Sequence, residues 1–346
     1  MTKRVLLIGH PVAHSYSAYM QQAAFDALGI DARYELVDTT VAALPERIEE
    51  LRSDEFLGAN VTIPHKERVA TLVDRLTEDA HATGAVNTIS KDGRKLVGHN
   101  TDVPAFRDAL DVLIGKQKMP RAAVVLGAGG GARAVVHALI TLGFQRVTVF
   151  NRHLHRGEAL VRHFGRSAAH MELKAMPWHE SVIESELSKS KVLINATSVG
   201  LASGESPIPG EVIPPELFVM DLVYNPPETR LLRDAAAAGA AALQNGEFML
   251  LRQGAFAFEL WTGQPAPVEL MREQLEVARS ASAGWDKEDA GGSGGGAGEA
   301  GGPGAAEGTA AAGQAAMAGG SATAGGSATA GGSAAAGGSA AAGDSA

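Results

Sequence analysis

The sequence predicts an α/β protein made of two domains with parallel sheets, followed by a disordered C-terminal tail. Short apolar runs such as Val5–Gly9 and Val124–Leu126 have the length and composition of buried strands. Stretches with helical periodicity separate these runs, and repeated alternation of strand and helix is typical of parallel sheets with crossover helices. The composition then changes at Lys287, where the globular part of the chain ends.

The predicted tail, residues 287–346, contains no aromatic residue and consists almost wholly of Gly, Ala, Ser and Thr. Its last part is a repeat whose Gly-Gly-Ser begins at Gly319, Gly325, Gly331 and Gly337. Such a segment buries too little apolar surface to offset the entropy of ordering it, so we expect it to be disordered.

Charge and cysteine content exclude several classes of function. One lysine and five acidic residues give the tail a net charge of −4, which leaves −5 of the total of −9 for residues 1–286. This mild acidity argues against a nucleic-acid partner. The absence of cysteine excludes disulfides, thiolate catalysis and Cys-ligated metals. No apolar run approaches the ~20 residues of a membrane span, and Val5–Ile8 is too short for a signal-peptide core, so we expect a cytoplasmic protein without a membrane partner.

The first unit of the N-terminal domain joins the strand Val5–Gly9 to a helix predicted over 18–28, which Gly29 ends. Ser15 and Ser17 lie where the strand ends and the helix begins. Two roles are open to their hydroxyls: capping of the helix, which the residue types alone favour, and binding of a ligand carboxylate.

A strand over 33–37 and a helix near 42–53 repeat this pattern, and the third unit carries a lysine in an unusual place. Its strand, Gly58–Ile63, ends in a proline turn that puts Lys66 at the start of the next helix. The positive end of a helix dipole disfavours a cation, so Lys66 does not serve stability there. The alternative is an ordinary solvated lysine that follows a turn.

A hairpin around Asp92-Gly93 follows, and Asn100-Thr101-Asp102 then begins a helix. Thr101 or Asp102 can serve as its N-cap. Each polar residue at these strand ends has such a structural explanation. Ligands in open α/β sheets, however, bind beyond the carboxyl ends of the strands, where these residues are expected to gather.

The C-terminal domain is organised around a glycine-rich turn between the strand that ends at Leu126 and a helix predicted over 131–142. Gly127, Gly129 and Ala132 fill the G-x-G-x-x-G/A positions of Rossmann dinucleotide-binding folds. In that pattern the N–H groups at the helix start face a pyrophosphate. The predicted cofactor-binding loop therefore consists of Gly127, Ala128, Gly129, Gly130, Gly131 and Ala132. Glycine-rich turns of this kind also occur where nothing binds.

The residues after the next strand, Arg146–Phe150, indicate which dinucleotide binds. An NAD site places a carboxylate there for the ribose 2′-hydroxyl, whereas basic groups hold the 2′-phosphate of NADP. This chain has Asn151, Arg152 and Arg156, and a guanidinium offers donors suited to a phosphate. The alternative is a pair of surface arginines at a helix start. We predict NADP as the cofactor.

Gln253 is a polar residue on an apolar helix predicted to end at Gly263. Four neighbours on that helix are expected to be buried: Leu250, Phe256, Ala257 and Leu260. A buried amide costs free energy unless it finds a partner, and a ligand hydroxyl would supply one. A last amphipathic helix is predicted over 269–278.

Taken together, these motifs resemble the shikimate dehydrogenase family. They follow one another in that family's order: His14-Ser15-Tyr16-Ser17, Asn60–Glu67, Gly84–Thr88, Asn100-Thr101-Asp102, Leu126–Gly130, Asn151–Arg156, Asn195–Gly200 and Asp221–Thr229. The resemblance covers about residues 4–280. It implies reversible, NADP-dependent reduction of 3-dehydroshikimate to shikimate in the chorismate pathway of aromatic amino-acid biosynthesis.

The resemblance also implies roles for individual residues. Lys66 is the catalytic general acid/base and Asp102 its partner. Ser15 and Ser17 hold the substrate carboxylate, while a hydroxyl-lined site can match the ring hydroxyls and reject analogues that lack one. The full set of substrate-binding residues is Ser15, Ser17, Thr62, Asn87, Tyr224 and Gln253. On the cofactor side the resemblance adds Ser198, Leu222 and Gly246.

Three positions depart from the family's pattern. Ala18 follows Ser17 where the family usually has proline, and Gln21 stands where a histidine is common. Both bear on the fine geometry of the carboxylate-binding subsite. After Asn-Thr-Asp the chain has Val103 where the family tends to have glycine.

The domain boundaries follow from these assignments. Residues 1–102 form the predicted substrate-binding catalytic α/β domain, and 103–245 the NADP-binding Rossmann domain. Residues 246–280 are expected to pack back on the first domain. No Asp/Glu/His cluster has metal-ligand spacing, so we expect no metal requirement.

Two other functions compete with this one. A quinate/shikimate dehydrogenase that uses NAD would share the fold and the catalytic pair, but Arg152 and Arg156 argue against it. A nucleotide-sensing module whose tail recruits partners is argued against by the intact pair of Lys66 and Asp102. The sequence fixes neither the oligomeric state, for which a homodimer is one option, nor the role of the tail.

Overall fold

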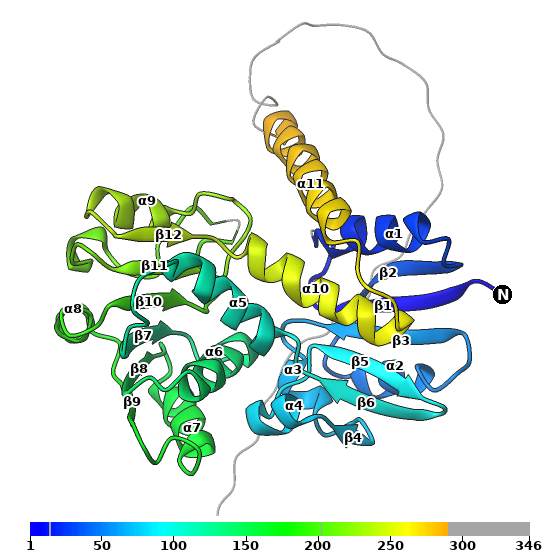
Figure 1. Cartoon of the computed structure of the whole chain (residues 1–346), viewed down its shortest axis with the longest axis horizontal. Coiled ribbons are helices and arrows are strands. Elements are labelled where there is room, and N and C mark those ends of the chain that lie inside the picture. The colour runs from blue at the N-terminus through cyan, green and yellow to red at the C-terminus, as the bar shows by residue number, and fades with distance from the viewer. Residues whose placement is uncertain (14, 202, 290–346) are drawn as a thin grey trace, which may run out of the picture. The chain divides into compact units, whose positions relative to one another are not determined.

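The computed structural model describes residues 1–13, 15–201 and 203–289, whose elements form two six-stranded sheets with helices packed on them (Figure 1). The strands of the first sheet are β1 Lys3–Gly9, β2 Ala32–Asp38, β3 Phe56–Val61, β4 Arg75–Leu76, β5 Thr88–Asp92 and β6 Lys95–His99. Those of the second are β7 Ala122–Leu126, β8 Arg146–Phe150, β9 Glu172–Met176, β10 Val192–Asn195, β11 Phe218–Asp221 and β12 Ala242–Gln244. The spatial orders are β2-β1-β3-β5-β6-β4 and β12-β11-β10-β7-β8-β9.

Helices connect these strands and follow the last one. Those that follow strands of the first sheet are α1 Ser17–Ala27, α2 Leu44–Glu50, α3 Lys66–Val69, α4 Glu78–Thr83 and α5 Asp102–Ile114. Those of the second are α6 Gly130–Thr141, α7 Leu154–Phe164, α8 Glu180–Leu187, the 3-10 turn η1 Gly210–Val212 and α9 Arg230–Ala237. The chain continues with α10 Glu247–Thr262 and α11 Val268–Asp289. None of the described helices is both long enough and apolar enough to span a bilayer.

The predicted α/β class with two parallel-rich sheets is confirmed. Each pairing in the second sheet is parallel, as are those of β1 with β2 and with β3. β5 pairs antiparallel with β3, and the hairpin β5–β6 is antiparallel because a two-residue turn can join only antiparallel neighbours. That turn begins at Gly93, whose φ of 60° suits glycine.

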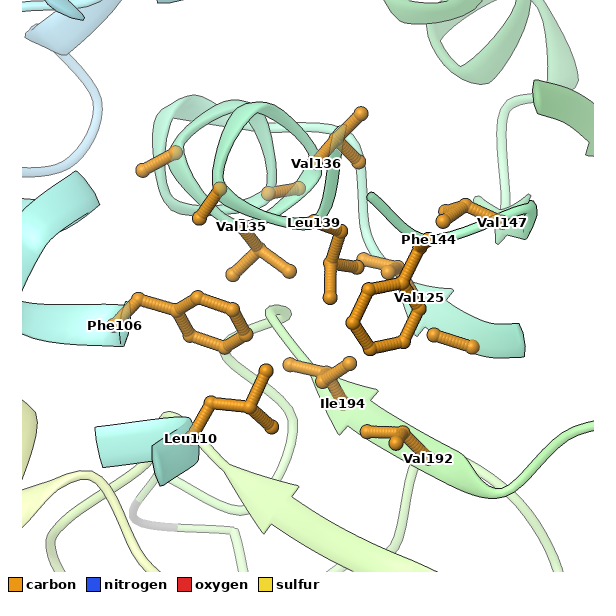
Figure 2. Close-up of a cluster of buried hydrophobic side chains, with 14 of the residues drawn as sticks. Phe106, Leu110, Val125, Val135, Val136, Leu139, Phe144, Val147, Val192 and Ile194 are labelled. Carbon is orange, nitrogen blue, oxygen red and sulfur yellow. The ribbon is translucent and has the colours of Figure 1, made fainter. Parts of the chain in front are cut away.

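The central strands of the second sheet consist mostly of apolar residues because helices bury both of their faces. Helices cover a sheet of parallel strands on both faces, so the side chains of the central strands are buried on either side. In Figure 2, Phe106 and Leu110 of α5 lie beneath Val135 of α6, in the same buried cluster as Leu139 of α6 and Val125 of β7. All five are fully buried, and a side chain of this kind contributes about 1.5–3 kcal/mol.

The C-terminal helices pack on elements of the first sheet as well as on α5. α10 lies against α5, α1 and β3, and α11 lies against α1 (Figure 1). The Phe258 ring lies 5.3 Å from that of Phe25 in a tilted arrangement, and the Trp261 indole donates to the Ile89 carbonyl at 3.0 Å. Leu260 was expected to be buried but is 40% exposed, since the buried face of α10 runs through Ala257, Phe258 and Trp261 and leaves Leu260 outside it.

Two predicted features lie wholly or partly outside the described residues. α11 runs past the predicted tail boundary to Asp289, and the rest of that tail, 290–346, lies outside the described ranges. His14 of the first motif also lies outside them.

Candidate active site

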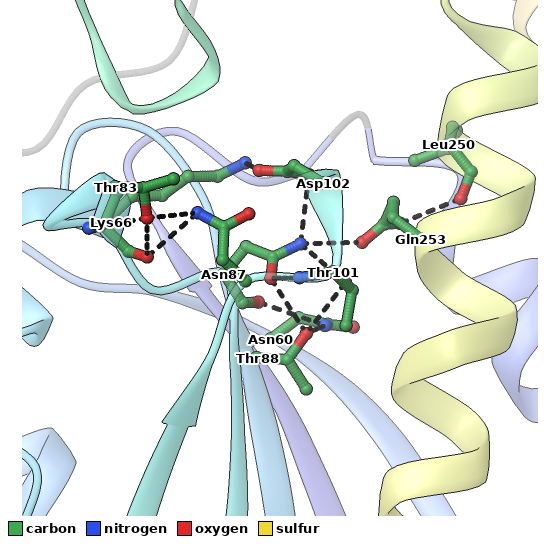
Figure 3. Close-up of polar contacts among 11 residues, drawn as sticks. Asn60, Lys66, Thr83, Asn87, Thr88, Thr101, Asp102, Leu250 and Gln253 are labelled. Atoms are coloured by element: carbon green, nitrogen blue, oxygen red, sulfur yellow. Dashed lines mark hydrogen bonds and ion pairs between the residues drawn. The ribbon is translucent and has the colours of Figure 1, made fainter. Parts of the chain in front are cut away.

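Two predicted catalytic residues meet at the starts of two helices. Lys66 is the first residue of α3 and Asp102 the first residue of α5, and Figure 3 shows the lysine side chain reaching across to the carboxylate. The Lys66 Nζ lies 2.6 Å from the Asp102 Oδ2, a charge-assisted hydrogen bond. The two side chains are only 17% and 6% exposed. Removing both charges from water is costly, so further hydrogen bonds are needed around them.

Asn87 supplies the second hydrogen bond of the buried carboxylate. Its Nδ2 donates to the Asp102 Oδ1 at 3.0 Å, to the Thr101 Oγ1 at 2.8 Å and to the Gln253 Oε1 at 3.3 Å. Its Oδ1 accepts from the Thr101 backbone N–H at 2.7 Å. Neither Thr101 nor Asp102 caps α5 through its side chain, so the capping alternative is wrong: those oxygens are already engaged by Asn87 and Lys66.

Gln253 enters this network from α10, a helix far along the chain. Besides accepting from Asn87, it donates through Nε2 to the Leu250 carbonyl at 2.9 Å (Figure 3). Both the amide oxygen and the amide nitrogen of Gln253, which was predicted to need a partner, therefore have partners within the protein. It remains partly exposed, and the structure brings Lys66, Asp102, Asn87 and Gln253 into one connected set.

A buried polar layer beneath Asn87 was missed by the sequence analysis. Asn60 donates through Nδ2 to the Asn87 carbonyl at 3.2 Å and to the Thr88 Oγ1 at 3.0 Å, and its Oδ1 accepts from the Tyr34 hydroxyl at 2.7 Å. Burial raises the pKa of Tyr34, which keeps it a neutral donor. The signal available in the sequence was Asn60 itself, an amide inside an otherwise apolar strand.

The residues predicted for a substrate carboxylate form a second group at the start of α1. The Ser15 Oγ accepts from the Ser17 backbone N–H at 3.3 Å, and the N-cap position belongs to Tyr16, without a side-chain cap. The Tyr224 ring lies 5.2 Å from that of Tyr16. Burial raises the pKa of Tyr224, against an opposing hydrogen bond with Ser15. Thr62 directly follows β3, and its backbone N–H donates to the Ile8 carbonyl.

The glycine loop has features that suit the predicted pyrophosphate. Gly127 has a φ of 110°, and a Cβ there would lie 2.7 Å from the Ala196 carbonyl oxygen. A Cβ at Gly129 would meet no atom within 4 Å, which leaves room beside the start of α6. No side chain caps α6, so its first N–H groups are available to an anion, and the loop fits the dinucleotide predicted for it.

The predicted 2′-phosphate residues lie at the start of α7. Arg152 is exposed, and the Asn151 Nδ2 donates to the His153 carbonyl at 2.9 Å. The Arg156 guanidinium is 52% exposed and lies 3.8 Å from the Glu67 carboxylate. Both arginines are therefore accessible to a ligand from solvent.

The residues predicted for the nicotinamide side lie after β10 and β11. Ser198 is exposed and Leu222 partly buried. A Cβ at Gly246 would collide with the Leu222 carbonyl oxygen, so a glycine is needed there for close packing against Leu222. A Cβ at Gly131 would lie 3.7 Å from the Leu222 side chain. In the described part of the chain, no group of three or more His, Asp or Glu side chains is arranged to hold a metal ion.

Comparison with known families and proteins agrees with this geometry. Residues 7–89 match the shikimate dehydrogenase substrate binding domain, 113–202 match shikimate / quinate 5-dehydrogenase, and 249–276 match the shikimate 5′-dehydrogenase C-terminal domain. A shikimate dehydrogenase (NADP(+)) of Methanopyrus kandleri is 42% identical over 277 residues, which are 79% of this chain and 95% of that protein. The chain belongs to the shikimate dehydrogenase family. Members of this family are oxidoreductases, and in this chain Lys66 and Asp102 lie in contact.

Solved structures of shikimate dehydrogenases have the same fold. The enzyme of Thermus thermophilus, in complex with NADP(H) and shikimate, is 41% identical, with a TM-score of 0.69 over 80% of this chain and 99% of that one. A quinate dehydrogenase from Corynebacterium glutamicum in complex with NAD is 30% identical, with a TM-score of 0.72 over 80% of this chain and 99% of that one. Since members with different cofactors share the fold, side chains must decide the cofactor.

Proposed function

We propose that this chain is an NADP-dependent shikimate dehydrogenase, which catalyses the reversible reduction of 3-dehydroshikimate to shikimate. The observation that carries the proposal is the buried 2.6 Å contact between Lys66 and Asp102, in a chain 42% identical to a relative named shikimate dehydrogenase (NADP(+)). A lysine and a carboxylate held in this way can transfer one proton, which is what interconversion of a ketone and an alcohol requires.

Lys66 is the proposed proton donor. The two electrons and the carbon-bound hydrogen of the reduction would come from bound NADPH. One N–H of the Lys66 ammonium donates to Asp102, and the others are left for the substrate oxygen. As negative charge develops on that oxygen, the ammonium stabilises it and gives it a proton. The Asp102 carboxylate holds the lysine in place through their 2.6 Å contact.

The remaining polar residues orient the substrate. Asn87 and Gln253 present amides beside the catalytic pair, and Thr62 presents a hydroxyl, which suits ring hydroxyls. Ser15 and Ser17, next to Tyr224, suit the carboxylate. Each of these roles is a proposal supported by residue chemistry and by the contacts described above.

The cofactor is assigned to the second sheet. The loop Gly127–Ala132 and the start of α6 suit the pyrophosphate, and Asn151, Arg152 and Arg156 suit the 2′-phosphate. Ser198, Leu222 and Gly246 are proposed to line the nicotinamide side.

These roles also divide the chain. We propose that residues 1–102 and 246–280 serve substrate binding and catalysis, and that residues 103–245 bind NADP. We propose a cytoplasmic location, and a homodimer as an assembly that sedimentation would check.

The decisive experiment is a four-way steady-state assay of the purified chain, with NADP⁺ or NAD⁺ as oxidant and shikimate or quinate as substrate. The proposal expects the highest kcat/KM for NADP⁺ with shikimate. A preference for NAD⁺ with quinate would establish the competing function, which Arg152 and Arg156 disfavour. No turnover with any of the four pairs would refute enzyme activity on these substrates.

A further inference from the structure

The segment that carries the catalytic lysine also touches the cofactor loop. A Cβ at Gly130, in the first turn of α6, would lie 2.8 Å from the Lys66 Cβ. The absence of a side chain at Gly130 therefore allows α3 and α6 to approach each other closely. The residue after Lys66 is Glu67, whose side chain reaches the same helix, α6, at Arg133.

Glu67 forms ion pairs with two arginines of the second sheet's helices. Its Oε2 lies 3.1 Å from the Arg133 Nε, and its Oε1 lies 3.8 Å from the Arg156 Nη2. Arg133 is only 14% exposed and is fixed further by a 3.0 Å hydrogen bond from its Nη1 to the Thr83 carbonyl. Glu67 is 40% exposed. A single carboxylate thus joins a buried arginine of α6 to the exposed Arg156 of α7.

The two arginines assigned to the 2′-phosphate differ in whether they form an ion pair with the protein. Within the ranges that the structure describes, Arg152 takes part in no ion pair, while Glu67 is the partner of Arg156. A 2′-phosphate that binds Arg156 must share it with this carboxylate, and two anions a few ångströms apart repel each other. The pair is half exposed and long, so it is weak enough for a ligand to displace.

We propose that Glu67 is a specificity-determining residue that limits the preference for NADP over NAD, because its carboxylate competes with the 2′-phosphate for Arg156. The inference rests on the proposed function only in assigning Arg156 to the 2′-phosphate. A ligand without that phosphate leaves the pair of Glu67 and Arg156 in place. Glu67 therefore weakens NADP binding selectively and has little effect on NAD.

Binding of adenosine 2′,5′-bisphosphate and of AMP to the full chain, measured by calorimetry, tests this without any turnover. Glu67→Gln removes the charge and keeps the shape. We expect it to tighten the bisphosphate by about threefold to tenfold at low salt, with AMP nearly unchanged, since a charge a few ångströms away is only partly screened there. The affinity for the bisphosphate divided by that for AMP should therefore rise in Glu67→Gln at low salt. This ratio should return toward the wild-type ratio as ionic strength rises.

Two variants make the result specific. Glu49→Gln removes the same charge from α2, where Glu49 pairs with Arg52 at 2.8 Å, and should leave the ratio unchanged. Glu67→Asp keeps the charge and should stay close to the wild-type ratio. An unchanged or lowered ratio in Glu67→Gln, or equal changes for both ligands, would overturn the inference. Failure of the proposed enzyme activity would show separately, as absent shikimate oxidation by the wild-type chain.

Discussion

The proposed catalytic network and the proposed 2′-phosphate subsite are built in opposite ways. Around Asp102, both carboxylate oxygens have protein donors, and the ion pair with Lys66 is almost wholly buried. Around Arg156, the guanidinium is half exposed and its protein partner lies at 3.8 Å. The protein alone holds the first site in place, whereas the guanidinium of Arg156 is left largely open to solvent.

This difference follows from what each site has to do. A proton donor must be oriented before the substrate arrives, and orientation by buried hydrogen bonds costs nothing further during the reaction. A subsite that recognises a charged group benefits from exposure, which attracts the anion from solution. Substitutions should therefore affect the rate in the first region and affinity in the second.

The largest effect is expected from Lys66→Ala. Loss of a positioned proton donor should lower kcat by about 10²–10⁴-fold, while the KM for shikimate changes much less. Steady-state kinetics of folded protein, checked by circular dichroism, measures this. Lys191→Ala removes an exposed lysine of the second sheet's region and serves as the control. A Lys66→Ala enzyme with wild-type kcat would end the catalytic assignment.

The double variant Arg152→Ala/Arg156→Ala should lower the affinity for NADP⁺. Two charge-assisted hydrogen bonds are lost, so kcat/KM for NADP⁺ should fall by about 10–100-fold, with NAD⁺ nearly unaffected. Arg162→Ala, further along α7 and 71% exposed in its side chain, is the matched control. Equal losses with both cofactors would show that these arginines do not read the 2′-phosphate.

Asn87→Ala should produce an intermediate effect on the rate. Asp102 loses a donor to its carboxylate, so its orientation toward Lys66 is less fixed and kcat should fall by about tenfold. Steady-state kinetics with shikimate measures this, and Asn87→Asp, which keeps the size of the side chain but removes the amide donor, should also lose activity. A kcat equal to that of the wild type in Asn87→Ala would show that Asn87 does not act through Asp102.

Ionic strength should separate the two regions without any substitution. Raising salt from about 0.05 to about 0.5 M screens exposed charges far more than buried ones, so the KM for NADP⁺ should rise by about threefold while kcat changes little. Initial rates at saturating shikimate measure both. A parallel loss of kcat would show that the Lys66–Asp102 pair is less protected than its burial indicates.

The smallest effect is expected from removal of residues 290–346. Every proposed site residue precedes them, so kcat/KM with NADP⁺ and shikimate should stay within about twofold of the full chain. Kinetics of the truncated and full chains side by side measures it. A large loss of kcat/KM would give the tail a functional role.

The element pattern, the cofactor loop and the members of the catalytic pair could all be predicted from the sequence alone. The first two are local features: apolar runs define strands, and glycine permits the φ of Gly127. The basic residues after β8 are a local feature too, and their role toward a 2′-phosphate stays a prediction. The roles of Lys66 and Asp102 came from the motifs' resemblance to a family.

Which polar groups satisfy one another depended instead on how the chain packs in three dimensions. Thr101 and Asp102 were open to a capping role from sequence, but Asn87 and Lys66 engage them instead. Asn87 also meets Gln253, 166 residues further along the chain, and no local pattern predicts such a contact. The pairing of Glu67 with Arg156 and the exposure of Leu260 are of the same kind, because both depend on how distant elements pack rather than on the residues beside them.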